Sequence, residues 1–379
     1  AISGGTPPFG ISWTGPNGFT SPAEDISGLN EGYYAVIVTD SKGCTATANI
    51  TLTQPPVLNA TVASTNVTCF GANDGTITIS GASGGTGNFE YSIDGGISWY
   101  GTGTFNGLAP GTYNVRIRDA VNPGCVLILN PALVITQPAQ LAATVANTDV
   151  TCFGANNGTI TITNSTGGYG SYQYTINGGA TWVGSGNFTS LAPGTYNVRI
   201  RDAANTSCVQ ILNPALVLAE PPALTATVNR TNITCFGSTD GTITVSGAVG
   251  GHGTYEYSIN GGGSWQSAGN YTGLTPGTYN VQIRDAEYPT CYIVLNGALV
   301  LTQPSVLTAT LSSTNVTCNS ASDGTISITG ASGGYGTYEY TINGGTTWNS
   351  SGLFTNVSPG TYDVRIRDAS NPTCIVTLN

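Results

Sequence analysis

Nine cysteines are the residues of this 379-residue chain whose chemistry and spacing are most regular. Eight of them form two series, each with an interval of 83 residues. The early series is Cys69, Cys152, Cys235 and Cys318, and the late series is Cys125, Cys208, Cys291 and Cys374. Close cysteine pairs are lacking and the chain has a single histidine, so the spacing disfavours metal binding and indicates disulfides in an oxidising, extracellular setting.

Two ways of pairing these cysteines follow from the repeat. We expect pairing within each unit, as in Cys69 with Cys125, because both cysteines recur once per unit. In a plain immunoglobulin topology, however, these two residues would lie at opposite poles of the sandwich, too far apart to bond. Pairing between units, such as Cys69 with Cys208, would then join the repeats lengthwise. Cys44 is left over, because its counterpart would precede Ala1.

The other residues capable of chemistry do not converge on a site. His252 occurs once, in an expected loop, so a repeated Ser-His or Cys-His arrangement is excluded. An Asp or Asn recurs before glycine in an expected turn of each unit. One such residue is enough to form a turn, whereas a calcium site would need several oxygen ligands that converge on one point. This series is Asp74, Asn157, Asp240 and Asp323. We therefore predict no catalytic, cofactor or metal site, with calcium as a weak alternative.

One short segment is similar to a known motif. Ser92 to Trp99 resembles the Asp-box of sialidases, which stabilises a hairpin remote from the sialidase active site. The Asp94 of this segment is replaced by Asn177, Asn260 and Asn343 in the other units. A β-hairpin with the Trp packed over it is the interpretation we favour.

The 83-residue period defines the structural units that must position these residues. A Gln or Glu before proline marks each junction, and such short, stiff linkers favour an elongated rod. Both ends of the chain are expected to stop inside a unit. The predicted immunoglobulin-like modules are 1–54 (first strands missing), 55–137, 138–220, 221–303 and 304–379 (end of the last strand missing).

Within one unit, alternation of polar and apolar residues predicts antiparallel strands. In 55–137 it covers Thr76–Ile79, Phe89–Ile93 and Tyr113–Arg118, and a more apolar last segment, Cys125–Ile135, is expected to cross between sheets at Asn130-Pro131. About seven short strands per unit is typical of an all-β, immunoglobulin-like sandwich. A tyrosine corner agrees with it, after Pro-Gly at Tyr113, Tyr196, Tyr279 and Tyr362, and at the equivalent position Tyr34.

Composition excludes some partners. The net charge is -10, from 19 acidic and 9 basic residues, whereas a nucleic-acid partner requires a basic surface. No apolar run approaches the roughly 18 residues of a membrane span, so we expect no membrane insertion here.

Taken together, VTCFGANDGTITISGASGG, the GTYNVRIRDA strand, the late cysteine and the closing ITQP resemble the SprB-type repeats of Bacteroidota cell-surface proteins. The family is named for a gliding-motility adhesin. The resemblance implies export by the type IX secretion system, an extracellular position on the cell surface, and a role in adhesion or gliding.

We therefore predict a structural and adhesive stalk or filament, not an enzyme. Its expected partners are surface polysaccharide, glycans or other cell-surface proteins, and self-association into filaments is possible. Arg116, Arg118 and Glu90 are expected to point outward from neighbouring strands, which predicts a cross-strand salt bridge or, alternatively, a sugar- or carboxylate-binding face. One alternative function is a glycan-binding array that uses exposed aromatics such as Tyr100 or Tyr271. Another is a set of accessory repeats of a larger secreted enzyme.

Overall fold

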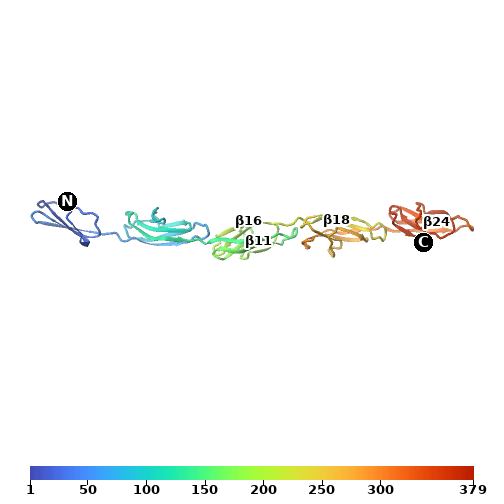
Figure 1. Ribbon diagram of the computed structural model, residues 1–379, viewed down its shortest axis with the longest axis horizontal. Helices are drawn as coiled ribbons and strands as arrows, with labels where there is room; N and C mark the ends of the chain where they lie inside the picture. The colour runs from blue at the N-terminus through green and yellow to red at the C-terminus, as the bar shows by residue number, and fades with distance from the viewer. The chain divides into compact units, whose positions relative to one another are not determined.

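The computed structural model describes residues 1–379 and is built of β-strands, with one short 3-10 turn, η1 (Pro16–Gly18) (Figure 1). None of its elements is a helix long and apolar enough to cross a membrane. The predicted all-β fold of tandem immunoglobulin-like units is confirmed. We call the five predicted ranges repeats 1 to 5, in chain order.

Six strands recur at equivalent positions in repeats 2 to 5, one fewer than the predicted seven. Repeat 2 holds β5 (Asn59–Thr65), β6 (Gly75–Ser83), β7 (Phe89–Ser92), β8 (Thr104–Leu108), β9 (Gly111–Asp119) and β10 (Val126–Ile135). Repeat 3 holds β11 (Ala139–Thr148), β12 (Gly158–Gly168), β13 (Tyr172–Thr175), β14 (Asn187–Leu191), β15 (Gly194–Asp202) and β16 (Val209–Leu218).

The last two repeats follow the same order. Repeat 4 holds β17 (Thr225–Thr231), β18 (Gly241–Val249), β19 (Tyr255–Ser258), β20 (Asn270–Leu274), β21 (Gly277–Asp285) and β22 (Tyr292–Leu301). Repeat 5 holds β23 (Ser305–Thr314), β24 (Gly324–Gly334), β25 (Tyr338–Thr341), β26 (Leu353–Val357), β27 (Arg365–Asp368) and β28 (Ile375–Thr377).

The strands of a repeat form two antiparallel three-stranded sheets. In repeat 2 the orders are β5-β6-β8 and β10-β9-β7, and repeats 4 and 5 have the same connectivity. The first, second and fourth strands therefore make one sheet, and the third, fifth and sixth make the other. This is the immunoglobulin arrangement reduced to six strands.

The core of a repeat lies between its two sheets. In repeat 2, Ile77 and Ile79 of β6 and Val115 of β9 form one buried cluster with Val67 and Ile135. The buried positions alternate along β6 and β9, as the period-two pattern predicts. Each strand therefore leaves its other face for polar and charged side chains.

The predicted crossing at Asn130-Pro131 is wrong. β10 stays in one sheet and pairs with β9 over its whole length, with register shifts on both sides of Asn130. Pro131 lacks an N–H for the ladder, and the Asn130 side chain instead accepts the Ala132 N–H at 3.0 Å. Since β10 lies at the edge of its sheet, it accommodates the proline with a bulge.

Repeat 1 forms a single sheet of four strands in the order β2-β1-β3-β4. These strands are β1 (Gly10–Thr14), β2 (Thr20–Ser21), β3 (Gly32–Thr39) and β4 (Thr45–Leu52). Phe9, Ile11, Trp13, Val36 and Ala48 help to line an open cavity of about 600 Å³ on this repeat. Glu24, Asp25 and Asp40 also lie in its lining, which is therefore both polar and apolar.

Contacts divide the chain into two compact units. The first consists of Ala1–Ala143, Asn164–Gln173 and Ile200–Gln210, and the second of Thr144–Thr163, Tyr174–Arg199 and Ile211–Asn379. Parts of repeat 3 belong to each unit. The boundary between the units therefore passes through repeat 3, whose residues make contacts with neighbouring repeats as well as with one another.

Two glycines of the β6–β7 turn provide a matched test of this packing. Gly84 and Gly87 both have φ +88°, but a Cβ on Gly84 would lie 2.1 Å from the Val57 carbonyl oxygen, whereas one on Gly87 meets nothing within 4 Å. Gly84→Ala should therefore destabilise repeat 2 by about 2 kcal/mol more than Gly87→Ala, which carries only the cost of its backbone conformation. Hydrogen exchange of the β5 and β6 amides measures the difference, and equal effects would contradict it.

Candidate functional site: the bonded joint between repeats

The cysteines pair between repeats, and the expectation of pairing within each unit is wrong. Each of the first three early cysteines is bonded to the late cysteine of the following repeat, 139 residues further along the chain. The Cα–Cα distances are 5.2 to 5.3 Å, which is ordinary for a disulfide. The pairs are Cys69–Cys208, Cys152–Cys291 and Cys235–Cys374.

The last strand of each repeat is the physical reason. Cys69 lies beside the far end of β10, because the Val67 N–H donates to the Thr136 carbonyl at 3.0 Å. Cys125 immediately precedes the start of β10, a strand of 10 residues. Ten extended residues span about 33 Å, far beyond the roughly 7 Å that a disulfide allows between Cα atoms. The two cysteines of one repeat therefore lie at opposite poles.

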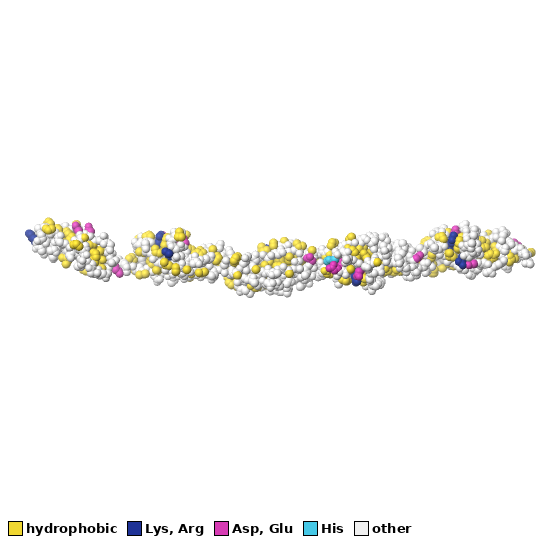
Figure 2. Space-filling model, viewed as in Figure 1, with side chains coloured by type: hydrophobic (Ala, Val, Ile, Leu, Met, Phe, Trp, Pro, Cys, Tyr) yellow, Lys and Arg dark blue, Asp and Glu magenta, His cyan; other side chains and the backbone are white.

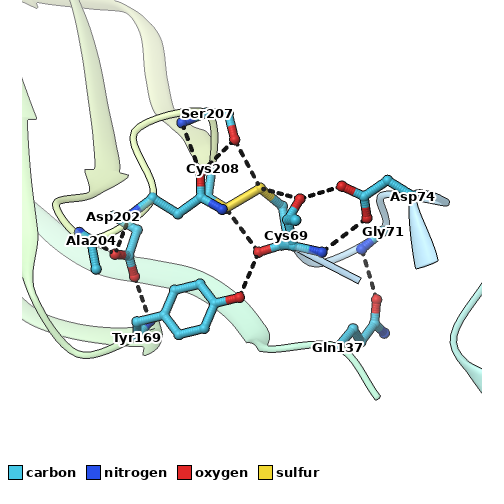
Figure 3. The surroundings of a disulfide bond; sticks show 11 residues. Cys69, Gly71, Asp74, Gln137, Tyr169, Asp202, Ala204, Ser207 and Cys208 are labelled. Atoms are coloured by element: carbon cyan, nitrogen blue, oxygen red, sulfur yellow. Dashed lines mark hydrogen bonds between the residues drawn. A yellow bond between two sulfur atoms is a disulfide. The ribbon is translucent and has the colours of Figure 1, made fainter. Parts of the chain in front are cut away.

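The Cys69–Cys208 bond lies in a network of polar contacts that includes Tyr169 and Asp74 (Figure 3). The hydroxyl of Tyr169, from repeat 3, donates to the Thr68 carbonyl oxygen at 3.0 Å, and Cys208 Sγ lies 3.2 Å from the same oxygen. On its other side, the Thr68 N–H donates to Asp74 Oδ1 at 2.9 Å. Hydrogen bonds thus hold the cysteine loop within repeat 2 and against repeat 3.

The linker residue takes part in the same joint. The Gly71 N–H, two residues after Cys69, donates to Gln137 Oε1 at 2.8 Å. The contact recurs from Gly154 to Glu220 at 2.8 Å and from Gly237 to Gln303 at 2.9 Å. In the sequence, these Gln and Glu residues indicate only the boundaries of the repeats. Their constant offset from each cysteine loop was the signal that could have revealed this role.

The residue that reaches across the joint differs between repeats. At the second joint His252 takes the place of Tyr169, and its Nε2 lies 3.1 Å from the Thr151 carbonyl oxygen. At the third joint Asn371 Nδ2 donates to the Thr234 carbonyl at 3.4 Å. His252, the one histidine of the chain, therefore belongs to a structural contact. The disulfide is constant across these joints, whereas the polar contact beside it varies.

Three cysteines are free and exposed: Cys44, Cys125 and Cys318. Cys125 belongs to the late series and Cys318 to the early series, so each presents half of a joint of the kind just described. The predicted set of candidates thus divides into six bonded and three free cysteines.

The tyrosines predicted to form corners share one contact. Each hydroxyl donates to the carbonyl oxygen four residues earlier, at 2.7 to 3.1 Å. The pairs are Tyr34 with Asn30, Tyr113 with Ala109, Tyr196 with Ala192, Tyr279 with Thr275, and Tyr362 with Ser358. This contact fixes the turn that precedes the fifth strand of repeats 2 to 5.

The Asp-box segment forms a closed turn. Asp94 accepts the backbone N–H groups of Ile97 and Ser98 at 3.0 Å, and Trp99 Nε1 donates to the Gly96 carbonyl at 3.0 Å. Desolvation raises the pKa of Asp94, but the hydrogen bonds from Ser98, Ser92 and Ile97 outweigh it and lower the pKa to about 2. The carboxylate is used to hold the turn.

The arginines of the outer sheet face are engaged with neighbouring side chains. Arg118 pairs with Glu90 at 2.6 Å and its guanidinium lies 4.4 Å from the centre of the Trp99 ring. Arg116 donates to Asn114 Oδ1 at 3.1 Å. Figure 2 shows the charged side chains as small, separate groups on a surface that is otherwise polar or hydrophobic. The ion pair that the pattern predicted is therefore present on this face.

The SprB repeat family matches four times, at residues 61–97, 144–181, 227–264 and 310–347. The chain carries SprB repeats. Each matched SprB segment begins in the first strand, contains the early cysteine and ends in the Asp-box turn. The late cysteine lies outside it, so a bond of the joint links one matched SprB segment to the unmatched part of the next repeat.

Three solved structures are similar to this SprB-repeat chain at low identity. Sidekick-1 immunoglobulin domains 1-4 are 12% identical, with 79% of this chain and 92% of that chain covered and a TM-score of 0.23. The S-layer protein rSbsC is 12% identical, with 97% and 60% covered and a TM-score of 0.20. The human desmocollin-1 ectodomain is 10% identical, with 97% and 91% covered and a TM-score of 0.21. No curated protein matches the chain.

Acid should weaken the cysteine loops that contain an aspartate. The side chain and backbone of Thr68 donate to Asp74 and lower its pKa below the usual value. Its stabilisation is therefore complete above the unfolded pKa of about 4 and is lost as the pH falls through the lower folded pKa. Asp240 and Asp323 are equivalent, and Asn157 is the natural control because it does not titrate.

NMR of the loop amides checks this prediction. Between pH 5 and pH 2, the Thr68, Thr234 and Thr317 amide resonances should shift with the carboxylates that accept from them. The Thr151 amide, which donates to Asn157 Oδ1 at 3.1 Å, should stay in place. A matching shift at Thr151 would show that acid acts on the joints by another route.

A non-reducing peptide map tests the connectivity directly. We expect Cys69 in one peptide with Cys208, Cys152 with Cys291 and Cys235 with Cys374, because only these pairs lie within bonding distance. Recovery of Cys69 with Cys125 would instead require that the end of β10 be remote from the Cys69 loop, contrary to the hydrogen bond between Val67 and Thr136.

Proposed function

We propose that this chain is a stretch of an extracellular stalk or filament that stands on a cell surface and serves adhesion. The recurring disulfide that joins each of repeats 2 to 4 to the next carries this proposal. A binding or catalytic domain gains little from a covalent bond to its neighbour, whereas a spacer that must keep its repeats in line gains directly. In this proposal the repeats form an elongated, semi-rigid rod.

The kind of repeat and the setting that disulfides need support the same function. SprB repeats take their name from a cell-surface adhesin, and disulfides persist in extracellular proteins. With the family come the further proposals of export by the type IX system, a bacterial host of the Bacteroidota, and a part in gliding motility. Each of these rests on the family alone.

We also propose that the repeats are structural and not catalytic. The residues that chemistry would need are occupied in holding turns and joints: Asp94 closes its hairpin, Asp74 holds the cysteine loop and His252 contacts Thr151. The proposed partners are surface polysaccharide, glycans or other cell-surface proteins, contacted weakly by many repeats at once, and self-association is part of the proposal. Many weak contacts add up through avidity.

Surface exposure is the first test of this function. An antibody raised against this chain should label intact, unpermeabilised cells of the source organism, and brief protease treatment of those cells should remove the label. A periplasmic protein probed in parallel controls for leakage. Labelling confined to permeabilised cells would overturn the proposal.

Adhesion is tested separately with monovalent Fab fragments. Fab fragments against the repeats should reduce the attachment of intact cells to a surface several-fold, because they cover many weak contacts at once. Fab fragments against an unrelated, equally abundant surface protein provide the control. Unchanged attachment with saturated repeats would restrict the stalk to a spacer and refute its adhesive role.

A further inference from the structure

The disulfides connect strands that are already extended. The first strand of a repeat ends shortly before its early cysteine, as β5 does before Cys69, and the last strand begins directly after its late cysteine, as β16 does after Cys208. From that last strand, three to six linker residues lead into the first strand of the next repeat. A covalent route can thus pass through a repeat along one strand.

One such route crosses repeats 2 to 5. It follows β5 to the Cys69–Cys208 bond and then β16 through the linker into β17. The Cys235–Cys374 bond carries it from β17 into β28. Residues 70–207 and 236–373 are bypassed, so their folded state contributes nothing to the length of this route.

A second route uses the strands that the first one leaves out. It follows β10 through the linker at Gln137 into β11, and the Cys152–Cys291 bond carries it into β22. From β22 it continues through the linker at Gln303 into β23. In repeats 3 and 4 each route takes one of the two outer strands, so the routes have no residue in common there.

The two outer strands of a repeat support one another. β5 and β10 contact each other, as do β17 and β22. Near their ends, the Thr136 N–H donates to Asn66 Oδ1 at 2.9 Å, and the Thr302 N–H donates to Asn232 Oδ1 at 3.1 Å. Side-by-side strands of different routes distribute load between them before any sheet is pulled apart.

We infer that these bonds make the chain a two-route covalent tether, which carries tension along outer strands and disulfides without unfolding its repeats. The inference rests on the proposed stalk function and adds a mechanical one. In a plain tandem array, force passes through every residue, and each repeat of 83 residues can release about 280 Å of chain when it unfolds. Here the strands under load are already near their full length of about 3.3 Å per residue.

Single-molecule stretching distinguishes the two behaviours. The oxidised full chain is held through residues 1 and 379 in optical tweezers and stretched before and after reduction in place with dithiothreitol. Repeats 2 to 5 should give no unfolding steps when oxidised and steps of about 240 Å each when reduced, the unfolded length less the folded one. Repeat 1 (residues 1–54) precedes the first bond and unfolds alike in both states, so its step identifies single tethers.

Two double variants provide a matched pair. Cys69→Ala with Cys208→Ala cuts the route between the held ends and should add on the order of 400 Å of releasable chain, up to the limit set by Cys152–Cys291. Cys152→Ala with Cys291→Ala removes the same kind of bond from the other route and should add no releasable chain between the held ends. A peptide map of each variant verifies that the remaining bonds are intact.

The lengthening of the two double variants distinguishes a tether from local staples. Unequal lengthening in the two variants supports the tether, because only the route between the held ends then matters. Equal lengthening, or unfolding steps of repeats 2 to 5 in the oxidised chain, overturns it and leaves the disulfides as local staples. Neither result bears on surface exposure, so failure of the tether and failure of the proposed stalk are seen in different experiments.

Discussion

The length of an extended strand is the constraint on which the structure depends. β10 occupies 10 residues between the two poles of its repeat, and each pole carries one cysteine. Because these residues cannot contract, the cysteines of one repeat cannot meet. The late cysteine of the next repeat is the partner that the joint brings within reach, so the rigidity of one strand determines the covalent connectivity of the whole series.

The joint shows which of its interactions must be constant and which are free to vary. The disulfide and the contact from the linker Gln or Glu recur at all three joints, whereas Tyr169, His252 and Asn371 make the contact to the threonine carbonyl in different ways. Once a covalent bond fixes the distance between two repeats, a neighbouring hydrogen bond adds about 1 kcal/mol and its donor can change. The variation is therefore a consequence of the bond.

The sequence allowed much of the fold to be predicted, and little of the joint. Alternation and the spacing of Tyr113 after Pro-Gly indicate strands and an immunoglobulin-like corner, because both depend on local geometry. The prediction that the chain crosses between sheets at Asn130-Pro131 was wrong, because a proline at a sheet edge can be accommodated by a bulge as well as by a change of sheet. Whether a chain bends or bulges there depends on its neighbours, which a local pattern does not contain.

The prediction of the cysteine pairing was wrong for a related reason. One early and one late cysteine per repeat is equally consistent with bonds inside repeats and bonds between them, so recurrence alone could not decide. What decides is the distance along β10, and the topology predicted from the sequence already implied it. A separation of about 33 Å between Cys69 and Cys125 excludes a bond, whereas the presence of one early and one late cysteine in each repeat excludes neither pairing. Geometry derived from a predicted fold should therefore outweigh a preference based on counting.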